Sequence, residues 1–201
     1  LLTFVEGDPA ALLVVEYYGA SEAELTAQVD GLRARLAGGD YRGAFGIAET
    51  TRQMADVIKV RKAGLGLLMS MRGDVKPVPF IEDAAVPVEH LADYVDGVQA
   101  IVRAEGAELA LYAHASAGCL HIRPLLNLKS AEGLRQYRAI AEAVAELVLR
   151  YGGTTSGEHG EGLSRGEFSR KLFGPQITEA FRQVKQAFDP AGLMNPGKVV
   201  D

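Results

Sequence analysis

Apolar positions in the first fifty residues form two nearly continuous runs with a helical stripe between them. The run 10–18 (AALLVVEYY) lies between a proline and a glycine, which is typical of a central strand. Ser21, with Glu24 three residues later, predicts a capped helix whose apolar residues recur at helical spacing up to residue 36. The run 41–49 predicts the next strand. These residues therefore predict one β-α-β unit.

A second unit of the same kind is predicted further along the chain. Residues 50–71 have helical spacing, and 80–86 is a strand candidate that two acidic residues make half polar. A proline at its favoured position opens a helix over 87–104. Two apolar runs, 109–113 and 120–126, predict a pair of strands joined by a turn. The two units are expected to share one sheet, which gives an α+β fold.

The C-terminal third is predicted to be helical on both sides of a glycine-rich stretch. Residues 130–150 begin with a capping serine and carry a helical apolar stripe. The stretch 152–162 holds five glycines, which let a backbone approach a ligand closely. Helical patterns return over 168–174 and 176–188, and a turn-rich tail follows. The expected organisation is thus a sheet domain with extra C-terminal helices.

Composition narrows the function classes. The 201 residues are 48% hydrophobic and 23% charged, as in an ordinary soluble domain, and the formal net charge of −5 argues against a nucleic-acid partner. The single cysteine excludes an internal disulfide and a thiolate zinc cluster. The sequence starts at leucine rather than methionine, so we expect a piece of a longer protein. We expect that protein to be cytoplasmic, or at most peripheral to a membrane.

Two histidines flank the predicted turn. In a two-residue hairpin centred on 117–118, His114 faces His121, and directly opposed Cβ atoms lie about 4.5–5.5 Å apart. Two imidazoles at that distance can hold one metal ion. Ala117 does not suit the commonest turn type, but the prediction needs only that both histidines reach one face. The same spacing also fits two buried strand histidines.

The glycine-rich stretch adds a carboxylate and a further imidazole, Glu158 and His159. The carboxylate can complete a set of two histidines and one acid with open positions for water or substrate. The adjacent histidine can serve as a base near neutral pH. Neighbouring residues of an extended segment point apart, so both should not ligate one ion unless the loop bends, which Gly157 and Gly160 permit. We expect Glu158 to face the histidine pair and His159 to face the substrate. The alternative is a loop histidine held for packing, and Glu161 is expected to be a solvated neighbour.

Three motifs in order resemble a known family. They are His114 to His121, the segment 156–160 (SGEHG), and the tail from Phe188-Asp-Pro to Asn-Pro-Gly-Lys198. Together they resemble the C-terminal domain of FAD-linked oxidases of the vanillyl-alcohol-oxidase type. Members include D-lactate, glycolate and D-2-hydroxyglutarate dehydrogenases. The resemblance implies a ferredoxin-like antiparallel cap that covers the substrate side of a flavin.

The resemblance also implies a domain division and roles for particular residues. Residues 1–201 would form the cap, with 1–151 as the ferredoxin-like core and 152–201 as the site loop and C-terminal helices. The FAD-binding domain would be a separate N-terminal part that is absent from this chain. The implied roles belong to positions that match the family motifs: metal ligands His114, His121 and Glu158, catalytic base His159, substrate contact Arg61, and cofactor contact Asn195.

The hairpin departs from the commoner family motif His-Ala-Gly-Asp-Gly-Asn-Leu-His at positions 116, 117 and 119. Cys119 stands where an asparagine is expected to touch substrate, and a thiol is a weak hydrogen-bonding group. The segment looks more like the long members that carry an iron–sulfur region. An iron–sulfur region or another electron acceptor is therefore an expected partner. Without a base aimed at it, Cys119 is expected to be a pocket wall rather than a nucleophile.

Other basic residues are candidates for the substrate carboxylate. Arg123 shares a strand face with His121 by alternation and could hold a carboxylate through two hydrogen bonds. The alternative for Arg123 is a solvent-facing or subunit-facing side chain. Arg61 could equally belong to a basic helix face, and Lys76 is a further candidate. His90, at the start of a helix, is expected to be exposed.

The leading hypothesis is the substrate cap of a flavin-dependent 2-hydroxy-acid dehydrogenase, with FAD in the missing domain and a divalent metal, zinc among the candidates. A metal-dependent hydrolase using the same ligands, active without flavin, is the first alternative. A non-catalytic ferredoxin-like binding or dimerisation module is the second. We expect the isolated chain to lack activity and tightly bound FAD. Apolar surface that normally faces the flavin domain would then favour a homo-oligomer.

Overall fold

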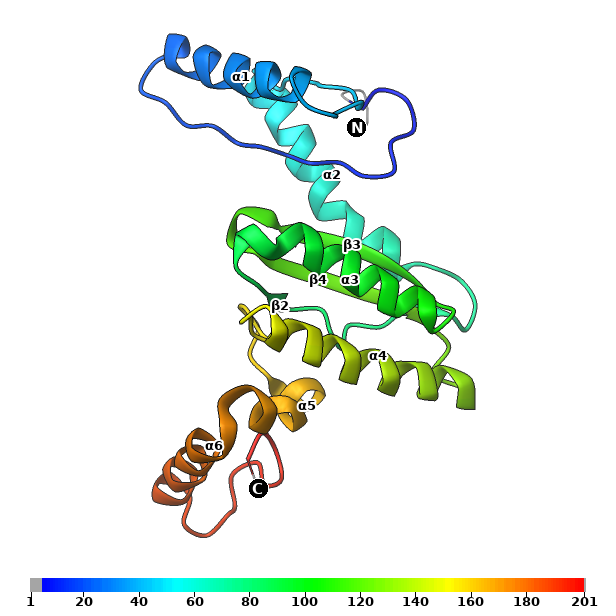
Figure 1. Ribbon diagram of the computed structural model, residues 1–201, viewed down its shortest axis with the longest axis vertical. Coiled ribbons are helices and arrows are strands. Elements are labelled where there is room, and N and C mark those ends of the chain that lie inside the picture. The colour runs from blue at the N-terminus through cyan, green and yellow to red at the C-terminus, as the bar shows by residue number, and fades with distance from the viewer. Residues whose placement is uncertain (1–4, 201) are drawn as a thin grey trace. The chain divides into compact units, whose positions relative to one another are not determined.

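The computed structural model describes residues 5–200. The chain divides into two compact units, Leu1–Leu68 and Met69–Asp201 (Figure 1). We describe each unit by itself. The grouping of 1–151 and 152–201 by role remains a prediction.

The first unit consists of two helices and irregular segments. Helix α1 spans Glu22–Ala37, and the Ser21 hydroxyl accepts a hydrogen bond from the Glu24 backbone N–H at 3.3 Å, which confirms the predicted cap. The Glu24 carboxylate accepts in turn from the Ala20 N–H at 2.8 Å. Helix α2 runs over Thr51–Met69 without a break. Both predicted helices are therefore present.

The strands predicted at 10–18 and 41–49 are not formed. Both segments lack a strand partner in the described part of the chain. Their apolar side chains remain accessible to solvent: Leu13 is 80% exposed and Tyr18 is 81% exposed. An apolar run favours burial of its side chains, but a strand also needs a neighbouring strand for its backbone hydrogen bonds. The first β-α-β unit is thus reduced to its helix.

The second unit contains a four-stranded antiparallel sheet, which confirms the α+β class. Its strands are β1 (Lys76–Pro77), β2 (Ala84–Ala85), β3 (Glu108–His114) and β4 (Cys119–Leu126). Strand β4 lies in the middle, with β3 along one edge. Strands β1 and β2 pair with opposite ends of its other edge. The predicted strand over 80–86 therefore shrinks to two residues.

The core lies on one face of this sheet. Helix α3 (Leu91–Ala104) follows a short 3-10 turn η1 (Val88–His90), and α4 (Ala131–Arg150) is capped by Ser130 as predicted. Both helices pack on the sheet and on each other (Figure 1). Every second residue of β4 is buried against them. The members of this core include Leu120, Ile122, Leu126, Tyr94, Val98, Val102, Ile140, Val144 and Val148. The other residues of β4 therefore face the opposite side.

The C-terminal residues form short and bent helices. Helix α5 spans Gly162–Arg165 and a 3-10 turn η3 spans Gly166–Phe168. Helix α6 spans Ser169–Phe188 with a kink at Gly174 and Pro175, so the two predicted helical segments are joined end to end. Asp189 closes the following turn by accepting from the Leu193 N–H at 2.9 Å. Among the described residues, the helices are too short or too polar to cross a membrane.

Candidate metal and substrate site

The β3–β4 hairpin places both histidines on the open face of the sheet, but in a different register from the predicted one. His114 pairs with Cys119, and His121 pairs with Tyr112. The connection is a 3-10 turn η2 (Ala115–Ala117) followed by Gly118 in the left-handed region, with φ at 67°. Only a glycine suits this place, because a Cβ atom on Gly118 would lie 1.9 Å from the Val86 carbonyl oxygen. The longer turn shifts the two histidines from opposed to diagonal positions.

The diagonal arrangement still brings the imidazoles together. The ring centroids of His114 and His121 lie 5.1 Å apart and the rings are nearly perpendicular, at 88°. Tyr112 fills the space beside them, stacked on His121 at 5.5 Å and edge-on to His114 at 5.5 Å. The expectation that both histidines share one face is therefore confirmed, whereas the two-residue hairpin is wrong.

The glycine-rich stretch is attached to the same end of the sheet. Thr154 and Ala85 exchange two backbone hydrogen bonds, at 2.8 and 2.9 Å, so the stretch lies beside β2 and pairs with it through one antiparallel bridge. A Cβ atom on Gly153 would lie 2.3 Å from the Ala85 carbonyl oxygen, which explains a glycine there. The Gly157 N–H then donates to the Asp83 carbonyl at 2.6 Å. These contacts fix the loop beside the histidine face.

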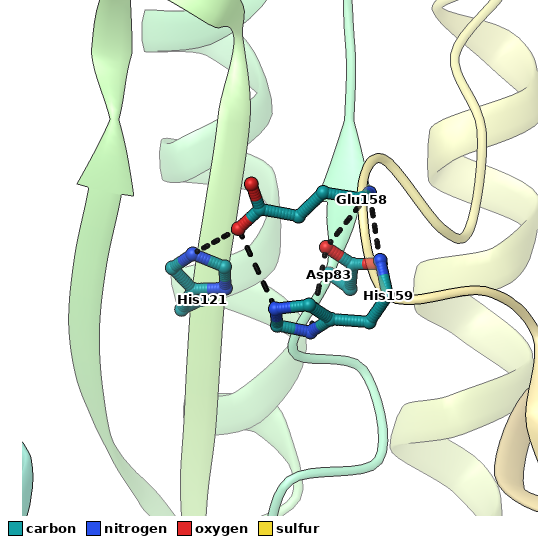
Figure 2. A group of neighbouring side chains, drawn as sticks. All are labelled: Asp83, His121, Glu158 and His159. Carbon is teal, nitrogen blue, oxygen red and sulfur yellow. Dashed lines mark hydrogen bonds and ion pairs between the residues drawn. The ribbon is translucent and has the colours of Figure 1, made fainter.

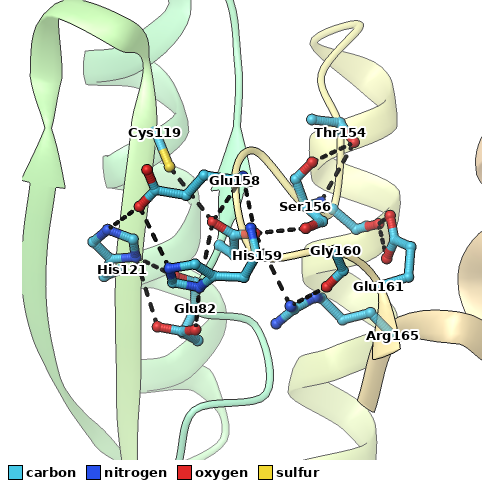
Figure 3. Close-up of polar contacts among 12 residues, drawn as sticks. Glu82, Cys119, His121, Thr154, Ser156, Glu158, His159, Gly160, Glu161 and Arg165 are labelled. Carbon is cyan, nitrogen blue, oxygen red and sulfur yellow. Dashed lines mark hydrogen bonds and ion pairs between the residues drawn. The ribbon is translucent and has the colours of Figure 1, made fainter. Parts of the chain in front are cut away.

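A buried carboxylate, Asp83, organises the tip of this loop. It is fully inaccessible to solvent and accepts from the Ser156 hydroxyl at 2.5 Å. It also accepts from the backbone N–H groups of His159 at 2.7 Å and Glu158 at 3.2 Å (Figures 2 and 3). Burial by itself would raise the pKa of Asp83, but these hydrogen bonds together hold that pKa below its usual value. Asp83 therefore acts as an anion that the loop wraps around.

The loop brings three imidazoles around one carboxylate oxygen. Glu158 Oε1 lies 3.1 Å from His121 Nε2 and 3.5 Å from His159 Nε2 (Figure 2). It also lies 3.6 Å from His114 Nε2. The His159 ring also stacks on His121, with centroids 5.3 Å apart. Glu158 therefore faces the histidine pair as predicted, and the loop bends so that the His159 ring is also directed at the Glu158 carboxylate.

This donor set fits a divalent metal ion. Zinc–nitrogen and zinc–oxygen bonds of about 2.0–2.2 Å place two ligands of a tetrahedral ion about 3.3 Å apart. The three distances around Glu158 Oε1 bracket that separation. Ligand atoms of Asp83, His121, Glu158 and His159 all lie within 4.8 Å of one another. Since the Asp83 oxygens are engaged by loop donors, the imidazoles and Glu158 are the groups available to an ion.

A third carboxylate, Glu82, contacts the imidazoles on the side away from Glu158. Its backbone carbonyl oxygen lies 2.9 Å from His121 Nδ1, and its Oε1 lies 2.8 Å from His159 Nδ1 (Figure 3). Both rings thus have one nitrogen tied to Glu82 and the other turned toward Glu158. Metal-binding histidines commonly use their second nitrogen in this way. Sequence reasoning missed Glu82 and Asp83 as site residues, although an acidic pair inside an apolar strand pattern was a visible signal.

Two of the predicted substrate residues lie close to this cluster. The Arg123 guanidinium lies 3.4 Å from Glu82 Oε2 and shares the histidine face, as predicted. The Cys119 thiol is buried and donates to Asp83 Oδ1 at 3.7 Å. Burial raises the pKa of Cys119 to about 11, and the nearby carboxylates of Asp83 and Glu158 add to the rise. Cys119 is therefore a wall beneath the loop.

The remaining candidate residues are Lys76, Arg61 and Asn195. Lys76 pairs with Leu126 at the opposite end of β4 and donates to the Met71 carbonyl. Arg61 lies on α2 in the first unit. Asn195 lies in the exposed tail with a positive φ of 50°. Their assignment to substrate or cofactor stays a prediction.

Two residues expected to be merely solvated have partners. The Glu161 carboxylate is partly buried and accepts from the Thr155 hydroxyl at 2.9 Å, and burial raises the pKa of Glu161. His90 is partly buried and packs on the Tyr151 ring at a centroid distance of 5.3 Å. The expectation of full solvation is wrong for both. The buried Arg165, the last residue of α5, also holds this loop, because it donates to the Gly160 carbonyl at 2.7 Å.

The fold and the site define a two-layer α+β domain that presents three imidazoles and a carboxylate on the open face of its sheet. Comparison with known proteins places this domain. The chain belongs to the family of FAD linked oxidases, C-terminal domain, whose model matches residues 3–199. This match confirms the resemblance drawn from the three motifs.

Relatives of known activity agree with that family. The chain is 35% identical over 205 residues to D-2-hydroxyglutarate dehydrogenase of Haemophilus influenzae, covering 99% of this chain and 20% of that protein. It is 38% identical over 194 residues to the Escherichia coli enzyme of the same name, covering 94% and 19%. D-lactate dehydrogenase of Archaeoglobus fulgidus is 33% identical over 198 residues, covering 97% and 40%. The chain thus spans about a fifth of the length of the first two relatives.

Proposed function

We propose that this chain is the substrate-facing cap of a flavin-dependent 2-hydroxy-acid dehydrogenase. The observation that carries the proposal is the convergence of His114, His121 and His159 on Glu158 Oε1, at 3.1–3.6 Å. A hydroxy acid presents a hydroxyl and a carboxylate that one divalent ion can bind together, and the hydroxyl proton needs a base nearby. The family match and the dehydrogenase relatives support the same reaction class.

The proposed roles follow from the positions of the side chains. His114, His121 and Glu158 hold a divalent metal ion, which when bound supplies a positive charge that binds and polarises the hydroxy acid. His159 Nε2 takes the proton from the hydroxyl group. The C2 hydrogen leaves with its electron pair as a hydride, and a C2=O double bond forms. FAD, held by a separate domain, supplies the hydride acceptor.

The proposed substrates are D-2-hydroxyglutarate, D-lactate or a close relative. Arg123 is a basic residue on the histidine face of the sheet, and its guanidinium is already paired with Glu82 at 3.4 Å. A substrate carboxylate would therefore share Arg123 with Glu82 rather than meet an unpaired cation. The further proposed partners are the FAD-binding domain and an electron acceptor, such as an iron–sulfur region.

Metal binding by the 201-residue chain tests the ligand assignment. Zinc and manganese titrations followed by calorimetry should show one site, which Glu158→Gln weakens because the carboxylate charge is lost. Glu161→Gln is the matched control, because it makes the same chemical change three residues away. The Glu161 carboxylate accepts a hydrogen bond from Thr155 rather than contacting an imidazole, so this variant should bind metal as the unchanged chain does. Equal metal affinity in all three proteins would reject the assignment.

Kinetics of the flavin-containing enzyme test the base. His159→Gln should retain metal and slow turnover of the hydroxy acid by about 100- to 10,000-fold, the usual contribution of a general base. Loss of metal in His159→Gln would instead make His159 a ligand. Near-normal turnover of that variant would refute its role as the base.

A further inference from the structure

The carboxylate of Glu82 contacts three side chains of the site but has no role in the proposed reaction so far. Its residue is only 8% exposed, and its two oxygens have separate partners. Oε1 lies 2.8 Å from His159 Nδ1 and Oε2 lies 3.6 Å from His121 Nδ1 (Figure 3). Oε2 also lies 3.4 Å from Arg123 Nη2. The carboxylate is thus held from one side by Arg123 while it contacts His159 from the other.

This contact fixes which nitrogen of His159 carries hydrogen. An ionised carboxylate has only acceptor sites, so the hydrogen bond to Glu82 requires a hydrogen on His159 Nδ1. In a neutral imidazole the hydrogen is then absent from Nε2, which keeps its lone pair. Nε2 is the nitrogen that faces Glu158 Oε1, at 3.5 Å. The atom that must accept a proton is therefore unprotonated and directed at the site.

The neighbouring groups do not replace Glu82 in this role. Asp83 Oδ1 lies 3.7 Å from His159 Nδ1, beyond hydrogen-bond distance, and Asp83 is engaged by Ser156 and the loop backbone. Glu158 contacts the opposite nitrogen of the ring. Burial makes the arrangement directional, because the Glu82 side chain is 11% exposed while that of His159 is 46% exposed. Glu82 therefore holds the His159 ring at Nδ1 and leaves the Nε2 side of the ring open.

We propose that Glu82 is the positioning residue of the base, holding the His159 ring and its Nδ1–H tautomer through Oε1. The proposal rests on the proposed role of His159. It assigns Glu82 no contact with substrate, so loss of its charge should lower kcat far more than it changes KM, which Glu82 affects only through the Arg123 that it shares with the substrate carboxylate. In serine proteases, changing the equivalent carboxylate to an amide selects the wrong histidine tautomer and lowers kcat by about 10,000-fold. Glu82→Gln should lower kcat by about 100- to 10,000-fold.

Four versions of the flavin-containing enzyme test this coupling: the unchanged protein, Glu82→Gln, His159→Gln and the double variant. If Glu82 acts through His159, the double variant should be no slower than His159→Gln, because the positioned ring is already gone. Glu161→Gln is the matched control, since it changes a nearby loop carboxylate that contacts Thr155 instead of an imidazole. It should retain the kcat of the unchanged enzyme.

A spectroscopic readout on the 201-residue chain is independent of turnover. Nitrogen-15 spectra of the imidazoles should show the Nδ1–H form of His159 in the unchanged chain and a loss of that form in Glu82→Gln. If Glu82→Gln does not fold, Glu82→Asp keeps the buried charge and withdraws the oxygens by one methylene. It should give a smaller spectral change and a correspondingly smaller loss of kcat.

The outcomes separate this inference from the proposed function. A slow His159→Gln beside a Glu82→Gln of unchanged kcat and unchanged tautomer overturns the role of Glu82 and leaves the base assignment intact. Multiplicative losses in the double variant also overturn it, since Glu82 would then act elsewhere. Normal turnover of His159→Gln refutes the base assignment, and the nitrogen-15 spectra alone then decide whether Glu82 positions the ring.

Discussion

Replacing Asp83 by asparagine should release the loop that carries Glu158 and His159. The carboxylate accepts from the Ser156 hydroxyl and from two backbone N–H groups of the loop, at 2.5–3.2 Å. The lowered pKa of Asp83 means that the folded structure favours the charged form in spite of complete burial. An uncharged side chain of the same shape must therefore lose stability.

The size of that loss follows from the number of donors. A hydrogen bond to a charged group contributes about 1.5–3 kcal/mol, and a buried donor without a partner costs about 1–3 kcal/mol. Asparagine keeps one acceptor oxygen but turns an NH₂ group toward the remaining donors. Removing a buried charge offsets part of the loss. We expect Asp83→Asn to cost about 2–4 kcal/mol, with the loop affected first.

Two measurements check this prediction on the 201-residue chain. Hydrogen exchange should show lower protection of the Glu158 and His159 amides, and denaturant unfolding should shift by the stated free energy. Asp96→Asn, the same change at an exposed position of α3, should stay within about 0.5 kcal/mol of the unchanged chain. Unchanged amide protection together with an unfolding free energy within about 0.5 kcal/mol would refute the reasoning.

Two further predictions concern the residues that shape the hairpin. Cys119, with its pKa raised from 9.0 to about 11, should react with iodoacetamide about 100-fold more slowly in the folded chain than in denaturant, since two pKa units leave about 100-fold less thiolate. The stability that the buried thiol contributes should be complete below pH 9 and lost as the pH rises through 11. Equal alkylation rates in the folded and denatured chain would contradict the burial argument. Gly118→Ala should lower the free energy of unfolding, measured in denaturant, far more than Gly106→Ala does. Both glycines have a positive φ, but a Cβ atom on Gly118 would lie 1.9 Å from the Val86 carbonyl oxygen, whereas one on Gly106 would lie 4.0 Å from Gln136. Similar losses of stability in the two variants would mean that backbone strain alone, and not the clash with Val86, sets the cost.

Local signals in the sequence predicted the helices well. The caps at Ser21 and Ser130 and the apolar stripes of α1 and α4 depend on residues within a few positions of each other. The hairpin depends on local and distant contacts together. Its turn is longer than predicted, and Gly118 within it packs against the carbonyl of Val86, a residue that the local pattern does not reveal as a neighbour.

The strands, and the contacts of Glu82 and Asp83 with the site loop, were harder to predict because they depend on partners far along the chain. The runs 10–18 and 41–49 have the composition of strands but no strand partner among the described residues. Glu82 and Asp83 meet the loop residues from more than 70 positions away. No periodicity links residues at such separations. The site ligands were found only because their chemistry and family motifs stood out in the sequence.

The two glycines beside Glu158 and His159 explain why adjacent side chains reach one point. A Cβ atom on Gly157 would lie 3.1 Å from both Ala85 Cβ and Cys119 Sγ, so a glycine lets the loop sit close to the sheet. Gly160, with φ at 82°, turns the chain away again. The bend overrides the alternation of an extended segment. Because His159 Nε2 and Glu158 Oε1 are only 3.5 Å apart, a proposed metal ion beside Glu158 and a proposed base at His159 would be direct neighbours. A substitution of Glu158 should therefore alter metal affinity and the orientation of His159 together, so its kinetic effect can be assigned to the metal only when the His159 tautomer is measured in the same variant.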